Sequence, residues 1–192
     1  MKVIAINGSA RKDANTAILI KEVFKELEAE GIETKMVQLS GKKIHGCAAC
    51  YKCFENKDRQ CAFKDDLNPI PEKMVEADGI ILGSPTYFAD VSAETKALID
   101  RSGFVSMANE RMFRRKVGAA VVAVRRAGAI HAFDTINHFF LIQEMIVPGS
   151  IYWNIGVGRE AGSVEGDEEG LRTMATLGKN MAWVVKRIVD VK

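Results

Sequence analysis

Five short runs of consecutive apolar residues recur along the chain, and they limit its possible folds more than any other feature. A half-exposed strand would alternate apolar and polar side chains, whereas continuous runs are typical of parallel strands buried on both faces. Between the runs, apolar residues are spaced by three and four, as in helices that cover a sheet. We therefore predict a doubly wound, three-layer α/β sandwich around a five-stranded parallel sheet. The runs fall at residues 3–6, 36–39, 80–82, 117–124 and 145–147.

The composition fits one domain of this kind. The chain has 192 residues, 47% of them hydrophobic, which is enough to bury one core. Its formal charge of +2 favours neither nucleic acid nor a membrane surface as a partner. No apolar stretch approaches the roughly 20 residues needed to cross a bilayer, and the run at residues 3–6 is too short for a signal peptide. We expect a single domain over residues 1–192, located in the cytoplasm.

The segment after the first run has the character of a phosphate site. Ser9, Arg11, Asn15 and Thr16 place hydroxyl groups, an amide and a positive charge at the start of a predicted helix, whose free N–H groups attract anions. The segment lacks the glycine patterns of dinucleotide and nucleoside triphosphate sites, so it favours a phosphate monoester such as that of FMN. The alternative is an ordinary turn in which Asn15 or Thr16 caps the helix.

The segments after the third and fourth runs contain groups suited to a flat polar ring. Pro85 fixes a turn, Thr86 offers hydrogen bonds, and Tyr87 and Phe88 supply flat apolar surface. The alternative is that the two aromatic side chains only cover the core. After the fourth run, residues 125–128 contain two arginines that suit a reduced flavin or an acidic substrate, or that form a solvated surface pair.

Together, residues 8–16 and 84–101 resemble the NADPH-dependent FMN reductase family of flavodoxin-like proteins, and the similarity covers nearly the whole chain. The resemblance implies a flavodoxin-like fold with FMN as cofactor. It implies that Ser9, Arg11, Asn15 and Thr16 hold the phosphate, that Pro85, Thr86, Tyr87 and Phe88 border the isoalloxazine ring, and that Ala127 and Gly128 approach the far side of the ring.

The four cysteines of the chain form one compact motif. Cys47, Cys50, Cys53 and Cys61 are separated by two, two and seven residues, unlike a disulfide framework that joins distant segments. Four thiolates from one loop can ligate a [4Fe–4S] cluster, although the spacing differs from that of bacterial ferredoxins. The alternatives are a structural zinc site, a redox-active pair such as Cys47 and Cys50, and cysteines without a ligand.

The cysteine pattern is similar to that of the iron-sulfur flavoproteins, a branch of the same family with its motif in the segment that corresponds to residues 41–66 here. That resemblance implies a homodimer or homotetramer in which electrons pass between a cluster and FMN across a subunit interface. Residues 152–154 lie past the last predicted strand, where they would fill such an interface or pack in the core.

We therefore expect an FMN-dependent oxidoreductase or electron-transfer flavoprotein that relays electrons between FMN and a [4Fe–4S] cluster. Its donor would be a reduced nicotinamide or a ferredoxin-like protein, and its acceptor a small molecule or a protein. The chemistry belongs to the cofactors, so no catalytic acid or base is expected among the side chains. The alternatives are a cluster-free NAD(P)H:quinone or FMN reductase and a non-catalytic protein with zinc in the cysteine loop.

Overall fold

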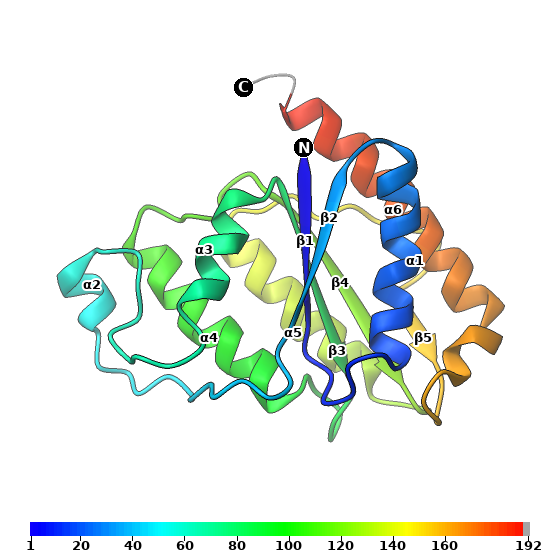
Figure 1. Cartoon of the computed structure of the whole chain (residues 1–192), viewed down its shortest axis with the longest axis horizontal. Helices are drawn as coiled ribbons and strands as arrows, with labels where there is room; N and C mark the ends of the chain where they lie inside the picture. The colour runs from blue at the N-terminus through cyan, green and yellow to red at the C-terminus, as the bar shows by residue number, and fades with distance from the viewer. Residues whose placement is uncertain (190–192) are drawn as a thin grey trace.

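The computed structural model describes residues 1–189 and contains a five-stranded parallel sheet in the order β2-β1-β3-β4-β5 (Figure 1). The strands are β1 (Lys2–Asn7), β2 (Glu33–Gln38), β3 (Gly79–Pro85), β4 (Val117–Val124) and β5 (Ile155–Val157). The helices are α1 (Asn15–Ala29), α2 (Lys52–Asn56), α3 (Pro69–Glu76), α4 (Ala93–Ala108), α5 (Ala129–Ile142), the 3-10 helix η1 (Ser163–Gly166) and α6 (Glu168–Val189). The predicted doubly wound, flavodoxin-like architecture is confirmed.

Two apolar layers hold the helices on the two faces of the sheet. On one face, α1 and α6 lie side by side (Figure 1) and pack on alternate residues of β1, β3 and β4. On the other face, α3, α4 and α5 cover the remaining residues of the same strands. The central strands are therefore buried on both sides, which is the physical reason for their continuous apolar runs.

The second strand begins earlier than its apolar run suggested. Pairing with β1 starts at Glu33, whereas the run predicted a strand at 36–39. The strand lies at the edge of the sheet, and polar residues occupy the half that is exposed to solvent. A search for continuous apolar runs misses polar positions of this kind.

The position predicted for the fifth strand from the sequence is wrong. The run at 145–147 contributes only an isolated bridge between Ile146 and Val117, and Pro148 follows it. The chain then bulges outward and returns to pair with β4 at Val122 to Val124, which makes β5 Ile155–Val157. The aromatic segment 152–154 consequently precedes the last strand instead of following it.

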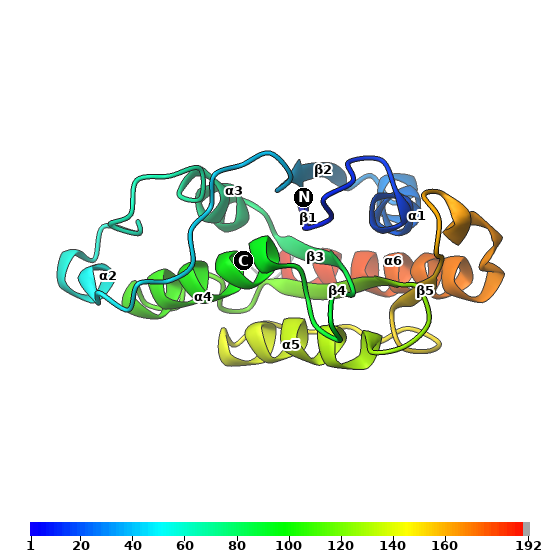
Figure 2. The ribbon, with the colours of Figure 1, turned by 90° about the horizontal axis from the view of Figure 1, so that it is seen from below.

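The cysteine loop joins β2 to α3 and lies at one end of the molecule, beyond α4 and away from α1 and α6 (Figures 1 and 2). Within it, the five-residue helix α2 was not predicted. Tyr51 and Phe54 pack their rings edge-on against Phe104 of α4, with ring centroids 6.0 and 6.1 Å away. These contacts dock the loop on the helix.

Within residues 1–189, no helix is long and apolar enough to cross a bilayer.

Candidate functional site

A cavity of about 200 Å³ opens at the carboxyl ends of β1, β3 and β4, which is where doubly wound sheets bind ligands. It gathers seven of the residues expected to bind a cofactor. They are Ser9, Arg11, Asn15, Thr16, Pro85, Thr86 and Tyr87. The loops that were far apart in the sequence therefore meet at one place.

The loop between β1 and α1 is held by its own hydrogen bonds. The backbone N–H of Ser9 donates to Asn7 Oδ1 at 3.0 Å, and that of Arg11 donates to Ser9 Oγ at 3.1 Å. The Gln38 side chain donates to the carbonyl oxygen of Ser9 at 2.5 Å, which ties the loop to β2. Contacts within the protein thus hold the shape of the loop.

The start of α1 is open to an anion. Ala14 occupies the N-cap position and, among the described residues, no side chain caps the helix. Amide N–H groups at an uncapped N-terminus carry a partial positive charge. The cavity lining adds the cations Arg11, Arg125 and Arg159 and, within residues 1–189, no carboxylate. This end of the cavity suits a phosphate dianion.

Asn15 has a structural partner of its own. Its side-chain amide donates to the carbonyl oxygens of Gly158 and Glu160 at 3.0 and 2.9 Å. Since Ala14 holds the N-cap position, neither Asn15 nor Thr16 caps α1. Asn15 instead fastens the loop after β5 to the cavity, which brings Gly158 and Arg159 into the lining. Sequence reasoning missed these two residues because it placed the last strand ten residues too early.

The loop after β3 forms the opposite wall. Both the N–H and the hydroxyl group of Thr86 donate to the carbonyl oxygen of Ala123, at 2.8 and 3.2 Å, so Thr86 is fixed against β4. Tyr87 lines the cavity with half of its surface exposed. Phe88 lies at the tip of the loop with φ of +48°, is fully exposed, and does not line the cavity.

Ala127 and Gly128 also lie outside the cavity lining. Gly128 adopts φ of +85°, and a Cβ atom there would lie 2.9 Å from Cα of Ala89. The loop after β4 therefore packs on the loop after β3 at a position that only glycine fits. Of the two neighbouring arginines, Arg125 lines the cavity and Arg126 is exposed beside it.

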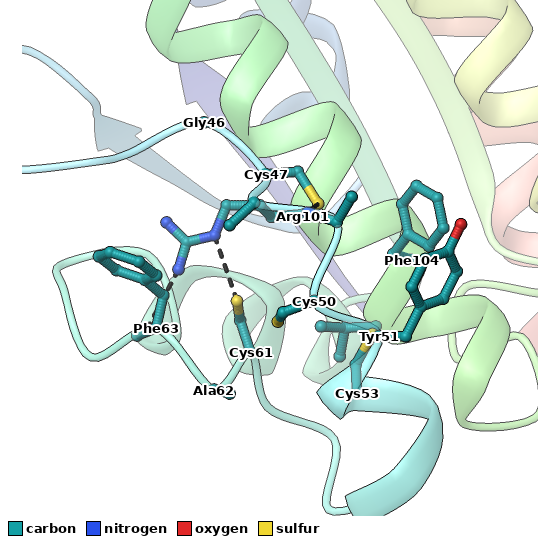
Figure 3. A pocket seen from close by; sticks show the side chains of 13 residues that line it. Gly46, Cys47, Cys50, Tyr51, Cys53, Cys61, Ala62, Phe63, Arg101 and Phe104 are labelled. Carbon is teal, nitrogen blue, oxygen red and sulfur yellow. Dashed lines mark hydrogen bonds between the residues drawn. The ribbon is translucent and has the colours of Figure 1, made fainter.

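The four cysteines line a second pocket, between the cysteine loop and α4 (Figure 3). Most of the other lining is apolar: Ala48, Ala49, Tyr51, Ala62, Phe63, Phe104 and Val105. The backbone N–H of Ala49 donates to Cys47 Sγ at 3.4 Å. Burial raises the pKa of the Cys53 thiol, and the neighbouring thiols of Cys61 and Cys50 raise it further. Hydrogen bonds from backbone N–H groups act in the opposite direction and lower this pKa, but by less. A metal that binds there has to displace the thiol proton.

The arrangement of the thiols bears on the kind of metal centre. In residues 1–189, no three cysteine, histidine or carboxylate side chains converge tightly enough to hold a single metal ion. A tetrahedral zinc ion draws four sulfur atoms to about 2.3 Å from one point. A cubane cluster binds each thiolate to a different iron, so its ligands stand further apart around a shared centre. The four thiols around one mostly apolar pocket supply the sulfur ligands that a cluster needs.

Arg101 of α4 closes the pocket and was not assigned a role from the sequence. Its side chain is 1% exposed and donates to Cys61 Sγ and Phe63 O at 3.3 and 3.2 Å (Figure 3). It also donates to His45 O and Asp65 Oδ2 at 3.1 and 2.5 Å. Burial is the largest single influence on the pKa of Asp65 and acts to raise it, but the hydrogen bond and charge of Arg101 and the backbone N–H groups of His45 and Leu67 together lower that pKa below its ordinary value. The signal was present in the sequence, because Arg101 follows the apolar residues Ala97 and Leu98 at helical spacing on the buried face of α4.

Similarity to known proteins assigns the family of the chain. The family model described as NADPH-dependent FMN reductase matches residues 1–160. The chain belongs to the NADPH-dependent FMN reductase family. An iron-sulfur flavoprotein of Methanocaldococcus jannaschii is 43% identical over 98% of this chain and 99% of its own length. Another, from Methanosarcina thermophila, is 33% identical over 98% of this chain and 97% of its own length. Within the family, the chain lies in the iron-sulfur flavoprotein branch.

Solved structures agree on the fold. A crystal structure of RosB with the bound intermediate 8-demethyl-8-formylriboflavin-5′-phosphate superposes with a TM-score of 0.77 at 18% identity, covering 99% of this chain and 81% of that one. An archaeal flavodoxin superposes with a TM-score of 0.65 at 17% identity, covering 97% and 99%. As a member of the family, the chain is a flavin-dependent oxidoreductase with FMN as its cofactor.

Proposed function

We propose that this FMN-dependent oxidoreductase also binds a [4Fe–4S] cluster on Cys47, Cys50, Cys53 and Cys61 and exchanges electrons between the two centres. The observation that carries the proposal is that all four thiols line one pocket next to a buried cation. The iron-sulfur flavoproteins to which the chain is similar over nearly its full length support it. FMN supplies two-electron and one-electron steps when bound, and a cluster supplies one-electron steps.

The residues of the first cavity divide the work of binding FMN. Arg11, Ser9 and the first-turn amides of α1 would hold the phosphate, since they form its positive end. Pro85, Thr86 and Tyr87 would border the ring system. Arg125 and Arg159 stand at the same cavity and give it a positive field that suits an anionic donor, such as a reduced nicotinamide nucleotide or an acidic ferredoxin-like protein.

We further propose that the working form is a homodimer or homotetramer. The two pockets share no lining residue in the described part of the chain, and the resemblance to the iron-sulfur flavoproteins implies electron transfer across a subunit interface. Large apolar side chains are exposed on α5 and on the segment before β5, which is the surface expected of an interface. They include Leu141, Ile142, Ile146, Ile151, Tyr152 and Trp153.

Anaerobic purification followed by a visible spectrum and assays for flavin, iron, sulfide and zinc tests the proposal. We expect about one FMN, four irons and four sulfides per chain. A yellow protein with neither iron nor sulfide would leave a cluster-free reductase. A protein with zinc in place of iron would leave the cysteine loop a structural role.

Two variants test whether the sites are separate. Cys50→Ala should abolish iron binding and retain FMN, because Cys50 lies outside the first cavity. Arg11→Gln should retain iron and bind FMN about tenfold more weakly, since one charge-assisted hydrogen bond contributes roughly 1.5 kcal/mol. Loss of both cofactors from either variant would contradict two independent sites.

A further inference from the structure

We propose that Arg101 is the positioning residue of the metal centre: it holds the ends of the cysteine loop together and directs an N–H donor and a positive charge to the sulfur of Cys61. This inference rests on the proposed cluster and concerns what sets its assembly and its reduction potential. The argument starts from the unusual burial of a guanidinium group that lies among the largest fully buried side chains of the protein.

Within the described residues, every hydrogen bond of the Arg101 side chain goes to the cysteine loop. One partner, the carbonyl oxygen of His45, lies two residues before Cys47, and the others lie between Cys61 and Asp65. These two stretches bracket all four cysteines. Arg101 comes from the middle of the 16-residue helix α4, which is packed in the core, so it provides a rigid point to which both ends of the loop are tied.

Asp65 also holds the two ends of the cysteine loop together. Its carboxylate accepts from Arg101, from the backbone N–H of His45 at 3.0 Å and from the backbone N–H of Leu67 at 3.1 Å. His45 is thus held through its carbonyl by Arg101 and through its N–H by Asp65. The ion pair is buried, with side-chain exposures of 1% and 5%. A buried and fully bonded pair of this kind fixes one geometry, because breaking it leaves an uncompensated charge.

Of the four cysteines, Cys61 is the one that hydrogen bonds fix most firmly. Its backbone N–H donates to Asn68 Oδ1 and its carbonyl accepts from Asn68 Nδ2, both at 2.9 Å. Its sulfur accepts from Arg101 Nε at 3.3 Å. Cys47 and Cys50 lie instead in an exposed stretch where Ala49 and Tyr51 have positive φ. The loop therefore presents one anchored sulfur and three on the segment that wraps around the pocket.

The same contact has an electrostatic consequence. Hydrogen bonds to the sulfur ligands and the net charge around an iron-sulfur cluster are among the factors that set its reduction potential. Reduction adds a negative charge, so an N–H donor from a cation stabilises the reduced form and raises the potential. Asp65 offsets part of this charge, but the guanidinium stands between the carboxylate and the sulfur, and its Nε faces Cys61.

Arg101→Gln and Arg101→Lys separate positioning from charge. The matched control is Arg59→Gln, which removes an exposed arginine from the same loop. All proteins are reconstituted anaerobically with ferrous iron and sulfide, and their FMN content reports whether they are folded. Iron retention is measured against a chelator. The reduction potential of the cluster is measured by redox titration with electron paramagnetic resonance.

We expect both Arg101 variants to keep FMN and to hold iron about tenfold less strongly than wild type, the usual cost of losing a residue that orients ligands. The reduction equilibrium of Arg101→Gln should shift tenfold, a potential 59 mV lower. Arg101→Lys should stay nearer the wild-type potential, and Arg59→Gln should match wild type in both readouts.

If Arg101→Gln binds the cluster with the same iron retention and the same reduction potential as the wild-type protein, the inference is overturned, although the proposed cluster is not. If Arg101→Gln fails to hold FMN, Arg101→Lys decides: weak iron retention with full FMN supports the inference, and full iron retention overturns it. A wild-type chain that holds no iron would overturn the proposed cluster, and this inference with it.

Discussion

Asp65 makes the stability of the cysteine loop depend on pH. Its pKa in the folded chain lies below the ordinary 3.8: burial acts to raise it, but the hydrogen bond and charge of Arg101 and two backbone N–H donors together outweigh burial. A lowered folded-state pKa gives stability that is complete above the unfolded pKa and that is lost as the pH falls through the folded one. The ion pair should therefore contribute fully at pH 7 and progressively less below about pH 4.

Asp65→Asn should lower the free energy of unfolding at pH 7 by about 3 kcal/mol, because it leaves the buried Arg101 without a counter-charge. Urea unfolding from pH 7 down to pH 3 measures the effect, and the difference from wild type should narrow as wild-type Asp65 protonates. The adjacent and exposed Asp66→Asn serves as control and should cost less than about 1 kcal/mol. A difference that does not change with pH would contradict the ion-pair explanation.

At the scale of single residues, the sequence indicated chemistry better than contacts. Ser9, Arg11 and Tyr87 follow strand ends, and topology brings such positions together. It could not show that Phe88 stands at a loop tip in solvent, since that depends on the positive φ of Phe88 and Ala89. The cysteine motif also could not show the role of Arg101, because the hydrogen-bond partners of Arg101 lie 36 to 56 residues away in the chain.

At the scale of elements, the junction of β1 with α4 depends on Gly8. Its backbone N–H donates to the carbonyl oxygen of Gly83 at 2.8 Å, and its own carbonyl accepts from the hydroxyl of Ser92, the N-cap of α4. A Cβ atom on Gly8 would lie 1.8 Å from Thr95 Oγ1. A side chain here must displace Thr95 and crowd the contact between the loop proposed to hold the phosphate and the start of α4.

Gly8→Ala should therefore destabilise the protein by about 2 kcal/mol, within the range for overpacking, and weaken FMN binding at least tenfold. Gly166→Ala is the matched control, because a Cβ there meets no atom within 4 Å. Chemical unfolding and flavin fluorescence titration measure the two effects. Unchanged FMN affinity in Gly8→Ala would show that the loop does not hold the phosphate as proposed.

The strands show what apolar runs can and cannot predict. Runs buried on both faces marked β1, β3 and β4, because every side chain in them lies in an apolar layer. At the edge, eight residues lie between Ile146 and Ile155, whereas only four lie between their partners Val117 and Val122 on β4, so the chain must leave the sheet between them. A run of three apolar residues carries no information about such an interruption.

At the scale of the whole molecule, the exposed apolar surface of α5 predicts self-association. Leu141 is 61% exposed, and monomers rarely leave several large apolar side chains together in water. Leu141→Lys should shift the protein from the homo-oligomer toward a smaller species in analytical ultracentrifugation. Ala29→Lys adds the same charge to an exposed position on α1 and should leave the mass unchanged. A wild-type monomer at micromolar concentration would contradict the prediction.

The cofactor cavity should couple the whole sheet to its ligand, because its lining comes from the loops after β1, β3, β4 and β5. FMN at one hundred times its dissociation constant should stabilise the flavin-free protein by about 2.7 kcal/mol, which raises the melting temperature of a chain this long by about 5 to 10 °C. Riboflavin at the same concentration should raise it less, since it lacks the phosphate that Arg11 and the start of α1 are proposed to bind. Differential scanning calorimetry measures both shifts. In Arg11→Gln the FMN shift should fall toward the riboflavin shift, which itself should not change. Equal shifts for the two ligands in the wild-type protein would mean that the positive end of the cavity serves some other anion.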